Sequence, residues 1–439
     1  MRILVLSNTA WDNQNSFGGS FSNIFSGIQG LQIANIYCRY GNPNNTVASE
    51  YFQITEKSLL RNLKSSSYPS GKRVLVDEAG MQLNAHEQAT FDTARKKRWK
   101  IFFWLRDFIW LVGRWRSPQL QAFIDDFKPD LIFQPVYYSN YLLRIAQYLK
   151  AYTGVPMVGY ISDDCYTLRQ FNLSPLYWLD RLHKRKKVKK VIRQCELLYV
   201  ISEIQKQDYE KAFGVPCKIL TKSADFSGEP PVKTQYNSPL QLVFTGNIGT
   251  NRWKSLAIIA EALEQINQNG VRAQLRIYTA TPLTAKMEKA LKKGDSSFIM
   301  GSVPANEVPK IQEAADILVH VEALDLKNRL AVRQSFSTKL VDYFKAARPI
   351  LAVGPREVAS IDHLIRNDCA LTGETVEEVR SALESVLENR GKLDELSKKA
   401  YACGKRNHNA ELMHHMLQTD LETIARRVEF EDFADKRSQ

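Results

Sequence analysis

The feature that most limits the fold of this chain is a repeated alternation of short apolar runs with stretches of helical periodicity. Apolar runs typical of buried strands lie at residues 3–6, 33–37, 128–136, 155–164 and 195–202, and again at 240–249, 273–281, 316–323 and 348–355. Helical patterns separate most of these runs, as at 118–127 and 253–266. Strands that alternate with helices predict parallel βαβ units in a doubly wound sheet.

A turn-rich stretch at 223–239 interrupts the pattern and indicates a linker, because it holds one Gly and three Pro. With 439 residues the chain is also too long for one ordinary core. We therefore expect two α/β domains, each opening with a strand and a glycine loop, and a helical tail that packs back across their junction. The expected domain bounds are 1–215, 216–405 and 406–439.

The positive charge is unevenly distributed. The chain has a net charge of +13, and residues 1–215 carry 29 Lys or Arg against 18 Asp or Glu. Such an excess favours a polyanionic or membrane-surface partner for the first half. The first apolar run is too short for a secretory signal, and six scattered cysteines indicate reduced thiols. We expect a cytoplasmic protein, peripheral on the inner face of the cell membrane if the first half binds lipid.

Residues 95–116 hold four of the seven tryptophans, eight basic residues and one acid. Arg106 and Asp107 divide the apolar run, which argues against a membrane span. Lys100, Asp107 and Arg114 recur every seven residues and predict one narrow polar stripe on a helix. Two alternatives stay open: a helix packed in the core, or a helix at an anionic membrane surface.

The segment 336–355 is the most informative for function. If 337–347 is a helix, Ser337 and Thr338 lie at its N-terminus, where free amides attract anions. Lys339 and Asp342 are three residues apart and share a face, so they could place a cation near phosphate and a carboxylate on a ribose diol. The alternative is helix capping and a surface ion pair.

The segment 244–256 offers a second part of a site. A strand leads into Gly246 and Asn247, and the loop after them carries Arg252 and Lys254 into a helix. Glycine permits close approach of a ligand, and the two cations could balance a diphosphate. Thr279, near the end of the strand at 273–281, joins this candidate donor site; the alternative for the Gly246 segment is a simple connecting turn.

The first half contains a similar glycine segment: Gly18 and Gly19 form a Gly-Gly turn before an expected helix. The alternative is a flexible turn. Neither GxGxxG nor GxxxxGK[ST] occurs in the chain, so nucleotide binding of those two types is not supported.

Residues 1–425 resemble a GT-B glycosyltransferase of the large retaining family that uses nucleotide sugars, and most of all its members that build bacterial surface polysaccharides. The segments that carry the resemblance are SFGGS, FKPDLIF, YVISEIQKQDYEKAFG, KSADF, FTGN…K, AADILVHVE and STKLVDYFKAARPILAVG. The resemblance implies two Rossmann-like domains, with the donor bound mainly by the second and the acceptor by the first. It also implies a C-terminal helix that crosses back to the first domain.

The resemblance also assigns residues. Gly18 and Gly19 match the glycine loop near the donor diphosphate, Gly246 and Lys254 match the phosphate region, and Asp342 matches the acid that holds the ribose. The other acid of that motif would fall at Gln334, and Asn247 replaces a usual arginine, with Arg252 as a substitute. The implied donor is a UDP-, GDP- or dTDP-sugar, with no metal or other cofactor, and the implied acceptor is a saccharide or lipid-linked saccharide.

Candidate catalytic groups follow strands of both halves. Asp163 and Asp164 come after the strand at 155–164, where open α/β sheets bind ligands, and either could position the acceptor or act as a base. Their alternative is helix capping. Lys254 with Arg252 could stabilise the leaving diphosphate, and Glu322, on the same side of a strand as His320, could meet the sugar. If configuration is retained, as the resemblance implies, a phosphate oxygen takes the proton.

Two other functions stay open. A nucleotide-sugar 2-epimerase shares the same fold. A nucleic-acid-binding protein would explain the basic run at 181–193, although no nucleic-acid fold signature accompanies it and its apolar residues suggest a helix with one buried side. We therefore expect no nucleic-acid partner.

Overall fold

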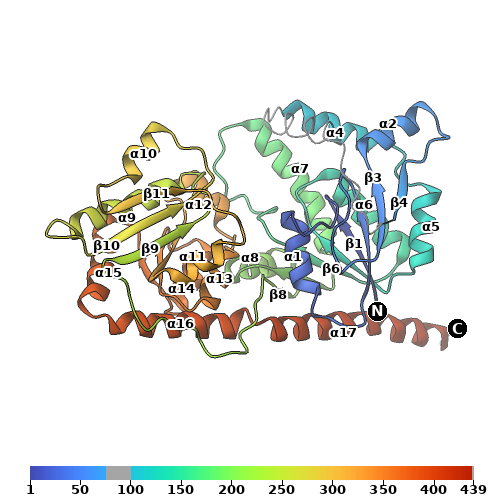
Figure 1. Ribbon diagram of the computed structural model, residues 1–439. Helices are drawn as coiled ribbons and strands as arrows, with labels where there is room; N and C mark the ends of the chain where they lie inside the picture. Colours follow the sequence, from blue (N-terminus) through green and yellow to red (C-terminus); the bar gives the residue numbers. More distant parts are fainter. Residues whose placement is uncertain (76–99, 438–439) are drawn as a thin grey trace.

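The computed structural model describes residues 1–75 and 100–437, with side chains in 1–75 and 105–426 (Figure 1). It has two α/β domains side by side and two C-terminal helices beneath them, Gly391–Asn407 under the second domain and Ala410–Arg437 under the first. The expected alternation of strands and helices is confirmed, and so is the expected class of two Rossmann-like domains.

The first domain is built on an eight-stranded sheet in the order β4-β3-β2-β1-β5-β6-β7-β8. Its strands are β1 (Arg2–Ser7), β2 (Gln32–Tyr37), β3 (Glu50–Ile54), β4 (Gly71–Val74), β5 (Leu131–Pro135), β6 (Met157–Ile161), β7 (Leu197–Val200) and β8 (Cys217–Ile219). The pairs are parallel except that β4 runs antiparallel to β3. The carboxyl ends of the parallel strands therefore share one edge of the sheet. The last strand, β8, lies just beyond residue 215, the expected end of the first domain.

Helices cover both faces of this sheet (Figure 1). They are α1 (Ser16–Phe25), α2 (Glu56–Lys64), α4 (Lys100–Val112), α5 (Pro118–Phe127), α6 (Asn140–Thr153), α7 (Pro175–Ile192) and α8 (Glu203–Phe213). Their ends follow local chemistry: Ser117 accepts a hydrogen bond from the Leu120 amide and Pro118 opens α5.

The second domain has a six-stranded parallel sheet in the order β11-β10-β9-β12-β13-β14. The strands are β9 (Leu240–Thr245), β10 (Ala273–Tyr278), β11 (Ser297–Gly301), β12 (Ile317–Val321), β13 (Ile350–Val353) and β14 (Leu371–Gly373). The helices are α9 (Arg252–Ile266), α10 (Ala285–Leu291), α11 (Val308–Ala314), α12 (Leu326–Val332), α13 (Lys339–Lys345), α14 (Ala359–Arg366), α15 (Val376–Glu388) and α16 (Gly391–Asn407).

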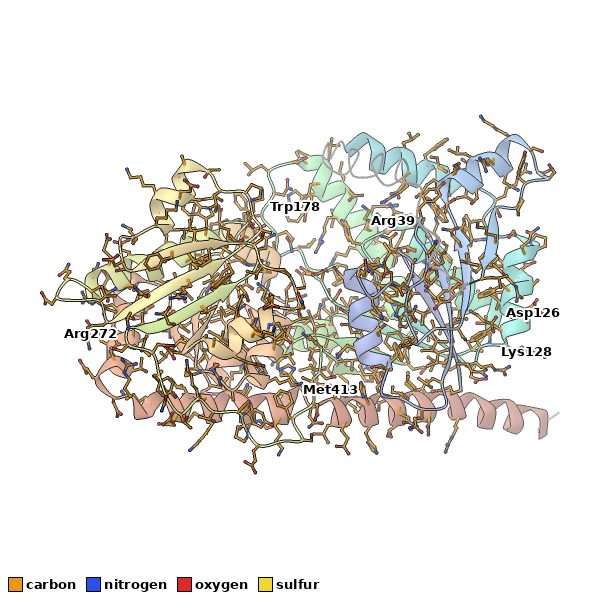
Figure 2. All side chains as sticks on the ribbon, in the orientation of Figure 1. Arg39, Asp126, Lys128, Trp178, Arg272 and Met413 are labelled. Carbon is orange, nitrogen blue, oxygen red and sulfur yellow. The ribbon has the colours of Figure 1, made fainter. Side chains whose placement is uncertain are left out.

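The last helix, α17 (Ala410–Arg437), returns to the first domain, as expected (Figure 1). Leu417 and Leu421 are fully buried under the first domain in an apolar cluster that continues into the second. The Asp420 carboxylate accepts hydrogen bonds from the Tyr199 hydroxyl at 2.9 Å and the Lys218 ammonium at 2.5 Å. Met413 lies where α17 passes the junction of the two domains (Figure 2).

Three expectations about elements need correction. Three elements, β3, α2 and β4, follow the strand at 33–37, where no strand or helix was expected. The helix expected at 337–347 begins only at Lys339. In the basic run at 181–193, Val188, Val191 and Ile192 are buried as expected, whereas Leu182 faces solvent.

The tryptophan-rich stretch is described from residue 100 onward, so residues 95–99 lie outside the described part, as does the Trp104 side chain. Trp110 is fully buried, stacks on Tyr141 at 4.4 Å between ring centroids, and donates from Nε1 to Glu56 at 2.9 Å. Asp107, a member of the expected polar stripe, is half-buried and accepts a hydrogen bond from Asn140 at 2.7 Å. No helix among the described residues is both long and apolar enough to cross a bilayer.

Candidate functional site

A short connection between α12 and α13 brings the second domain into contact with the first. The Ser202 hydroxyl, which follows β7, donates to the Gln334 carbonyl at 2.7 Å. Asp208 of α8 accepts hydrogen bonds from Arg333 and from the Gln334 side chain. Gln334, where the resemblance would place an acid, is almost fully buried and serves this contact. The carboxyl edge of the first sheet therefore lies against the entry to α13.

Two cations and one carboxylate gather beside the end of β9. The Glu322 carboxylate, just after β12, accepts from Arg252 Nε at 3.0 Å and lies 2.9 Å from Arg252 Nη2. Lys339 Nζ donates to the Thr245 carbonyl at 3.0 Å. Glu322 is buried, whereas about a third of the Arg252 side chain is exposed. This cluster has a net positive charge at the carboxyl ends of β9 and β12, where open α/β sheets bind ligands.

Gly246 makes room for Lys339. A Cβ atom at this position would lie 1.9 Å from Lys339 Nζ. The backbone φ of +142° is also one that residues other than glycine rarely adopt. A lysine of the chain itself therefore occupies the space that this glycine leaves, and close approach of a ligand there stays a prediction.

The ionisation of the cluster follows from its burial. Burial raises the pKa of Glu322, and Arg252 and Lys339 oppose that change. Burial and the nearby Arg252 lower the pKa of Lys339. Burial, Lys339 and Arg252 lower the pKa of His320 to about 3, so this histidine is neutral at ordinary pH. Its Nε2 lies 3.1 Å from the Ser360 hydroxyl and 3.7 Å from Glu322, behind the cluster.

The loop after Gly246 is held by a small polar network. Asn247 is exposed, and its side-chain oxygen accepts from the Gly249 amide at 2.6 Å and the Thr281 hydroxyl at 3.3 Å. Thr279 is buried and its hydroxyl accepts from the Thr281 amide at 3.1 Å. Thr279 and Asn247 therefore fix the loop that carries Gly246.

Lys254 lies apart from the other predicted cation. It is exposed, approaches the Trp253 ring at 5.8 Å, and acts on Asp325 as a neighbouring charge. Asp325 in turn accepts from Asn251 at 2.8 Å. Of the two cations proposed from 244–256, Arg252 therefore contacts Glu322, whereas Lys254 lies near Asp325 at the start of α12.

The N-terminus of α13 differs from the expected arrangement. Ser337 and Thr338 precede a helix of only seven residues, and Thr338 makes no side-chain capping bond. Lys339 and Asp342 have different partners in the structure: Lys339 reaches the Thr245 carbonyl, while the Asp342 carboxylate accepts from Lys222 Nζ at 2.6 Å. Asp342 stays partly exposed, with 43% of its side chain accessible.

Asp163 and Asp164 have different surroundings. Protein atoms crowded around Asp163 and the adjacent Asp164 charge raise the Asp163 pKa, while a hydrogen bond with the Ser335 side chain acts in the opposite direction. Asp164 is buried in an ion pair with Arg181 at 3.3 Å and accepts from two amides of its own loop, those of Tyr166 and Thr167. Asp163 is therefore the carboxylate that reaches the second domain, and Asp164 holds its loop.

Gly18 and Gly19 lie inside the first turn of α1, not in a turn ahead of it. Asn15 caps the helix by accepting from the Gly18 amide at 2.8 Å. A Cβ at Gly18 would lie 2.1 Å from the Asp12 carbonyl oxygen, so this glycine permits close packing of α1 on the preceding loop. Gly19 is exposed.

Sequence reasoning missed Lys222, Ser202 and Asp208. Lys222 lies 120 positions from its partner Asp342, and Ser202 lies 132 positions from Gln334. No local spacing signals such pairs. The segment KSADF, which contains Lys222, carried part of the family resemblance and was the available clue. Among the described residues no group of three or more His, Cys, Asp or Glu could hold a metal ion.

Known proteins share the fold and part of the sequence pattern. Residues 239–389 match the family glycosyl transferases group 1. None of the curated proteins compared matches the chain in sequence. Among solved structures, HepE from Anabaena in complex with UDP has a TM-score of 0.61 at 10% identity, over 96% of this chain and 100% of that chain.

Two further structures have the same architecture. Sucrose-phosphate synthase from Thermosynechococcus elongatus has a TM-score of 0.58 at 12% identity, over 97% of this chain and 99% of that chain. An α,α-trehalose-phosphate synthase (UDP-forming) from Burkholderia vietnamiensis has a TM-score of 0.57 at 13% identity, over 96% of this chain and 100% of that chain. Residues 239–389 are therefore similar to the glycosyl transferases group 1 family, within a chain of two Rossmann-like domains in the GT-B architecture.

Proposed function

We propose that this chain is a glycosyltransferase that moves a sugar from a nucleotide sugar to a saccharide or lipid-linked saccharide in cell-surface polysaccharide synthesis. The observation that carries the proposal is the Arg252–Glu322–Lys339 cluster beside Gly246, inside the matched group 1 domain. The UDP bound to HepE and the UDP-forming reaction named for the Burkholderia enzyme favour UDP as the nucleotide, before GDP or dTDP. The six free, buried cysteines fit a reducing cytoplasm.

The leaving diphosphate would bind between Arg252 and Lys339. These cations repel each other, which contributes to the lowered pKa of Lys339, and a bound diphosphate would relieve that repulsion. Charge that develops on the departing phosphate oxygen is then stabilised by groups already in place, without a metal ion. Glu322 lies where it could accept hydrogen bonds from the sugar, and Asp342 could accept them from the ribose.

The acceptor would approach from the first domain, beside Asp163. In a retaining transfer, the bond between the anomeric carbon and the phosphate oxygen breaks, and the bond to the acceptor oxygen forms on the same face. The acceptor proton passes to the departing phosphate oxygen, so Asp163 would position the acceptor hydroxyl rather than remove its proton. The resemblance in sequence supports retention.

Thermal-shift measurements with UDP-, GDP- and dTDP-sugars test the donor site. We expect one nucleotide series to raise the melting temperature of the wild type, because ligands stabilise the state they bind. Arg252→Ala should lose most of that shift, since charge-assisted bonds to phosphate are lost. Lys310→Ala is the matched control, because Lys310 is a surface cation with 74% of its side chain exposed.

No shift with any nucleotide or nucleotide sugar would overturn the proposal. Product analysis separates the remaining enzyme class: a donor epimerised at C2, with no glycosyl product on any acceptor, would favour a nucleotide-sugar 2-epimerase. A shift that is equal in the wild type and Arg252→Ala would move the donor site away from the cluster.

A further inference from the structure

One face of the first domain carries many solvent-exposed apolar side chains. On α4, Leu105, Phe108, Leu111 and Val112 are exposed and lie on one side of the helix, because they are spaced by three or four residues or are adjacent. Leu111 has 63% of its surface accessible, while Trp110 on the opposite side is fully buried. We name this surface of α2, α4, α7 and the β6–α7 loop the apolar–basic face.

The exposed residues of neighbouring elements extend this surface. They are Leu60 and Leu63 on α2, Leu168, Phe171 and Leu173 in the β6–α7 loop, and Leu176, Leu179 and Leu182 on α7. In Figure 1, α2 and α4 lie at the top of the first domain, and α7 begins at the same side and runs down towards the centre of the molecule. Large contiguous apolar patches on a folded protein mark sites of protein or membrane interaction.

Contacts show that the elements are neighbours. Trp110 of α4 donates to Glu56 of α2 at 2.9 Å. Asn140, at the start of α6, bridges α4 and α7: its amide nitrogen donates to Asp107 at 2.7 Å, and its amide oxygen accepts from Lys187 at 3.0 Å. These contacts place α2, α4 and α7 next to one another along the first domain.

Positive charge accompanies the apolar residues. Within α2, residues 105–116 and α7 there are thirteen Lys or Arg and three Asp or Glu. On α7 the exposed side changes along the helix, from Leu176 and Leu179 to His183, Lys186 and Lys190. All five positions lie on one side at helical spacing. The helix thus combines an apolar half with a basic half.

We propose that the apolar–basic face docks on an anionic lipid bilayer. Apolar side chains enter the boundary between headgroups and acyl chains, while Lys and Arg bind anionic headgroups. A symmetric dimer through the same face would place one basic surface against an identical one, so like charges would oppose pairing with a second copy. The charge complementarity therefore favours lipid over self-association.

The docking itself does not depend on the proposed function, but it has a consequence that does. The β6–α7 loop begins at Asp163 and Asp164 and reaches Leu173 within ten residues. Trp178, in the apolar half of α7, lies on the side of the first domain that faces the second (Figure 2). A docked enzyme would hold its acceptor side close to the headgroups, as a lipid-linked acceptor requires.

Vesicle flotation tests the docking with the full chain. We expect the wild type to float with vesicles of phosphatidylcholine and phosphatidylglycerol, to float weakly with phosphatidylcholine alone, and to be released at high salt. Phe108→Glu with Leu111→Glu should lower the partition coefficient by at least about 100-fold, because each buried apolar side chain contributes roughly tenfold or more. Lys186→Ala with Lys190→Ala should lower it about 25-fold, or roughly fivefold for each charge.

Leu412→Glu on α17 is the matched control, since Leu412 is 60% exposed but lies outside the apolar–basic face. It should float like the wild type. No flotation of the wild type on anionic vesicles, or equal flotation of all variants, would overturn the proposal. A wild-type dimer that Phe108→Glu with Leu111→Glu converts to a monomer, without vesicle binding, would assign the face to a second copy. Tight, salt-sensitive binding to random DNA without flotation would assign it to nucleic acid.

Discussion

At the scale of single residues, the site depends on how Arg252 and Lys339 are placed around the buried Glu322 carboxylate. Arg252 and Glu322 satisfy each other, whereas Lys339 has its ammonium on a backbone carbonyl beside Gly246. A carbonyl is a weaker partner for an ammonium than an anion is. Lys339 is therefore the cation with most to gain from a phosphate.

Asp342→Ala should weaken binding of the nucleotide sugar about tenfold to 100-fold, because a ribose hydroxyl loses a charged acceptor. The Lys222–Asp342 ion pair can give way to the ribose, because the Lys222 and Asp342 side chains are 33% and 43% exposed. Such exposed pairs contribute at most about 1 kcal/mol. Lys222→Ala is the control and should change affinity by less than about fivefold. Calorimetric titration measures both, and unchanged affinity in Asp342→Ala would remove Asp342 from the site.

His320 should make the protein less stable as the pH falls. Its pKa is lowered from 6.5 to about 3 in the folded state, so below pH 6.5 the unfolded chain binds a proton that the folded chain does not. Stability is therefore complete above pH 6.5 and is lost towards pH 3, by about 2 kcal/mol at pH 5. His320→Asn should lose less stability than the wild type between pH 7 and pH 5 in urea unfolding. Equal losses in the two proteins would contradict this assignment.

At the scale of elements, α1 shows how one glycine can be essential and its neighbour dispensable. Gly18→Ala should destabilise the protein by about 1–3 kcal/mol, because the added Cβ would lie 2.1 Å from the Asp12 carbonyl oxygen. Gly19→Ala should change stability by less than about 1 kcal/mol, since alanine favours helices and the added Cβ would meet only the Asn13 carbonyl oxygen, at 3.3 Å. Melting temperatures test the pair, and equal effects of the two substitutions would show that packing on Asp12 does not matter.

The order of elements was largely predictable from the sequence, because buried parallel strands are continuous apolar runs and helices have their own period. The short β3 and β4 were missed since neither forms such a run. Helix capping, the alternative for Asp164, does not describe its surroundings, because no helix begins in its loop, all of which the structure describes; the carboxylate accepts from two loop amides and pairs with Arg181. The exposed side of α4 was also not predictable, since apolar residues surround most of that helix and only tertiary contacts decide which are buried.

At the scale of the whole molecule, two kinds of contact join the domains. The α17 helix buries Leu417 and Leu421 and is bound to the first domain through Asp420. The connection between α12 and α13 instead relies on a few polar contacts with Ser202 and Asp208. Polar contacts between domains are easier to break than a buried apolar seam, so relative motion of the domains would open the junction there while α17 stays attached.

Asp208→Asn should increase the fraction of molecules in which the domains separate at this junction. The substitution removes the charge that pairs with Arg333, whose side chain is only 10% exposed, and this should cost about 1–3 kcal/mol. The radius of gyration from small-angle X-ray scattering should rise in the free protein and return towards the wild-type value with a nucleotide sugar that bridges both domains. Asp180→Asn is the control, because the partners of Asp180, Lys184 of α7 and the Tyr138 hydroxyl, both belong to the first domain. If both variants keep the wild-type radius, the Asp208 contacts do not hold the domains together, and closure must depend on α17 and the apolar cluster beneath the junction.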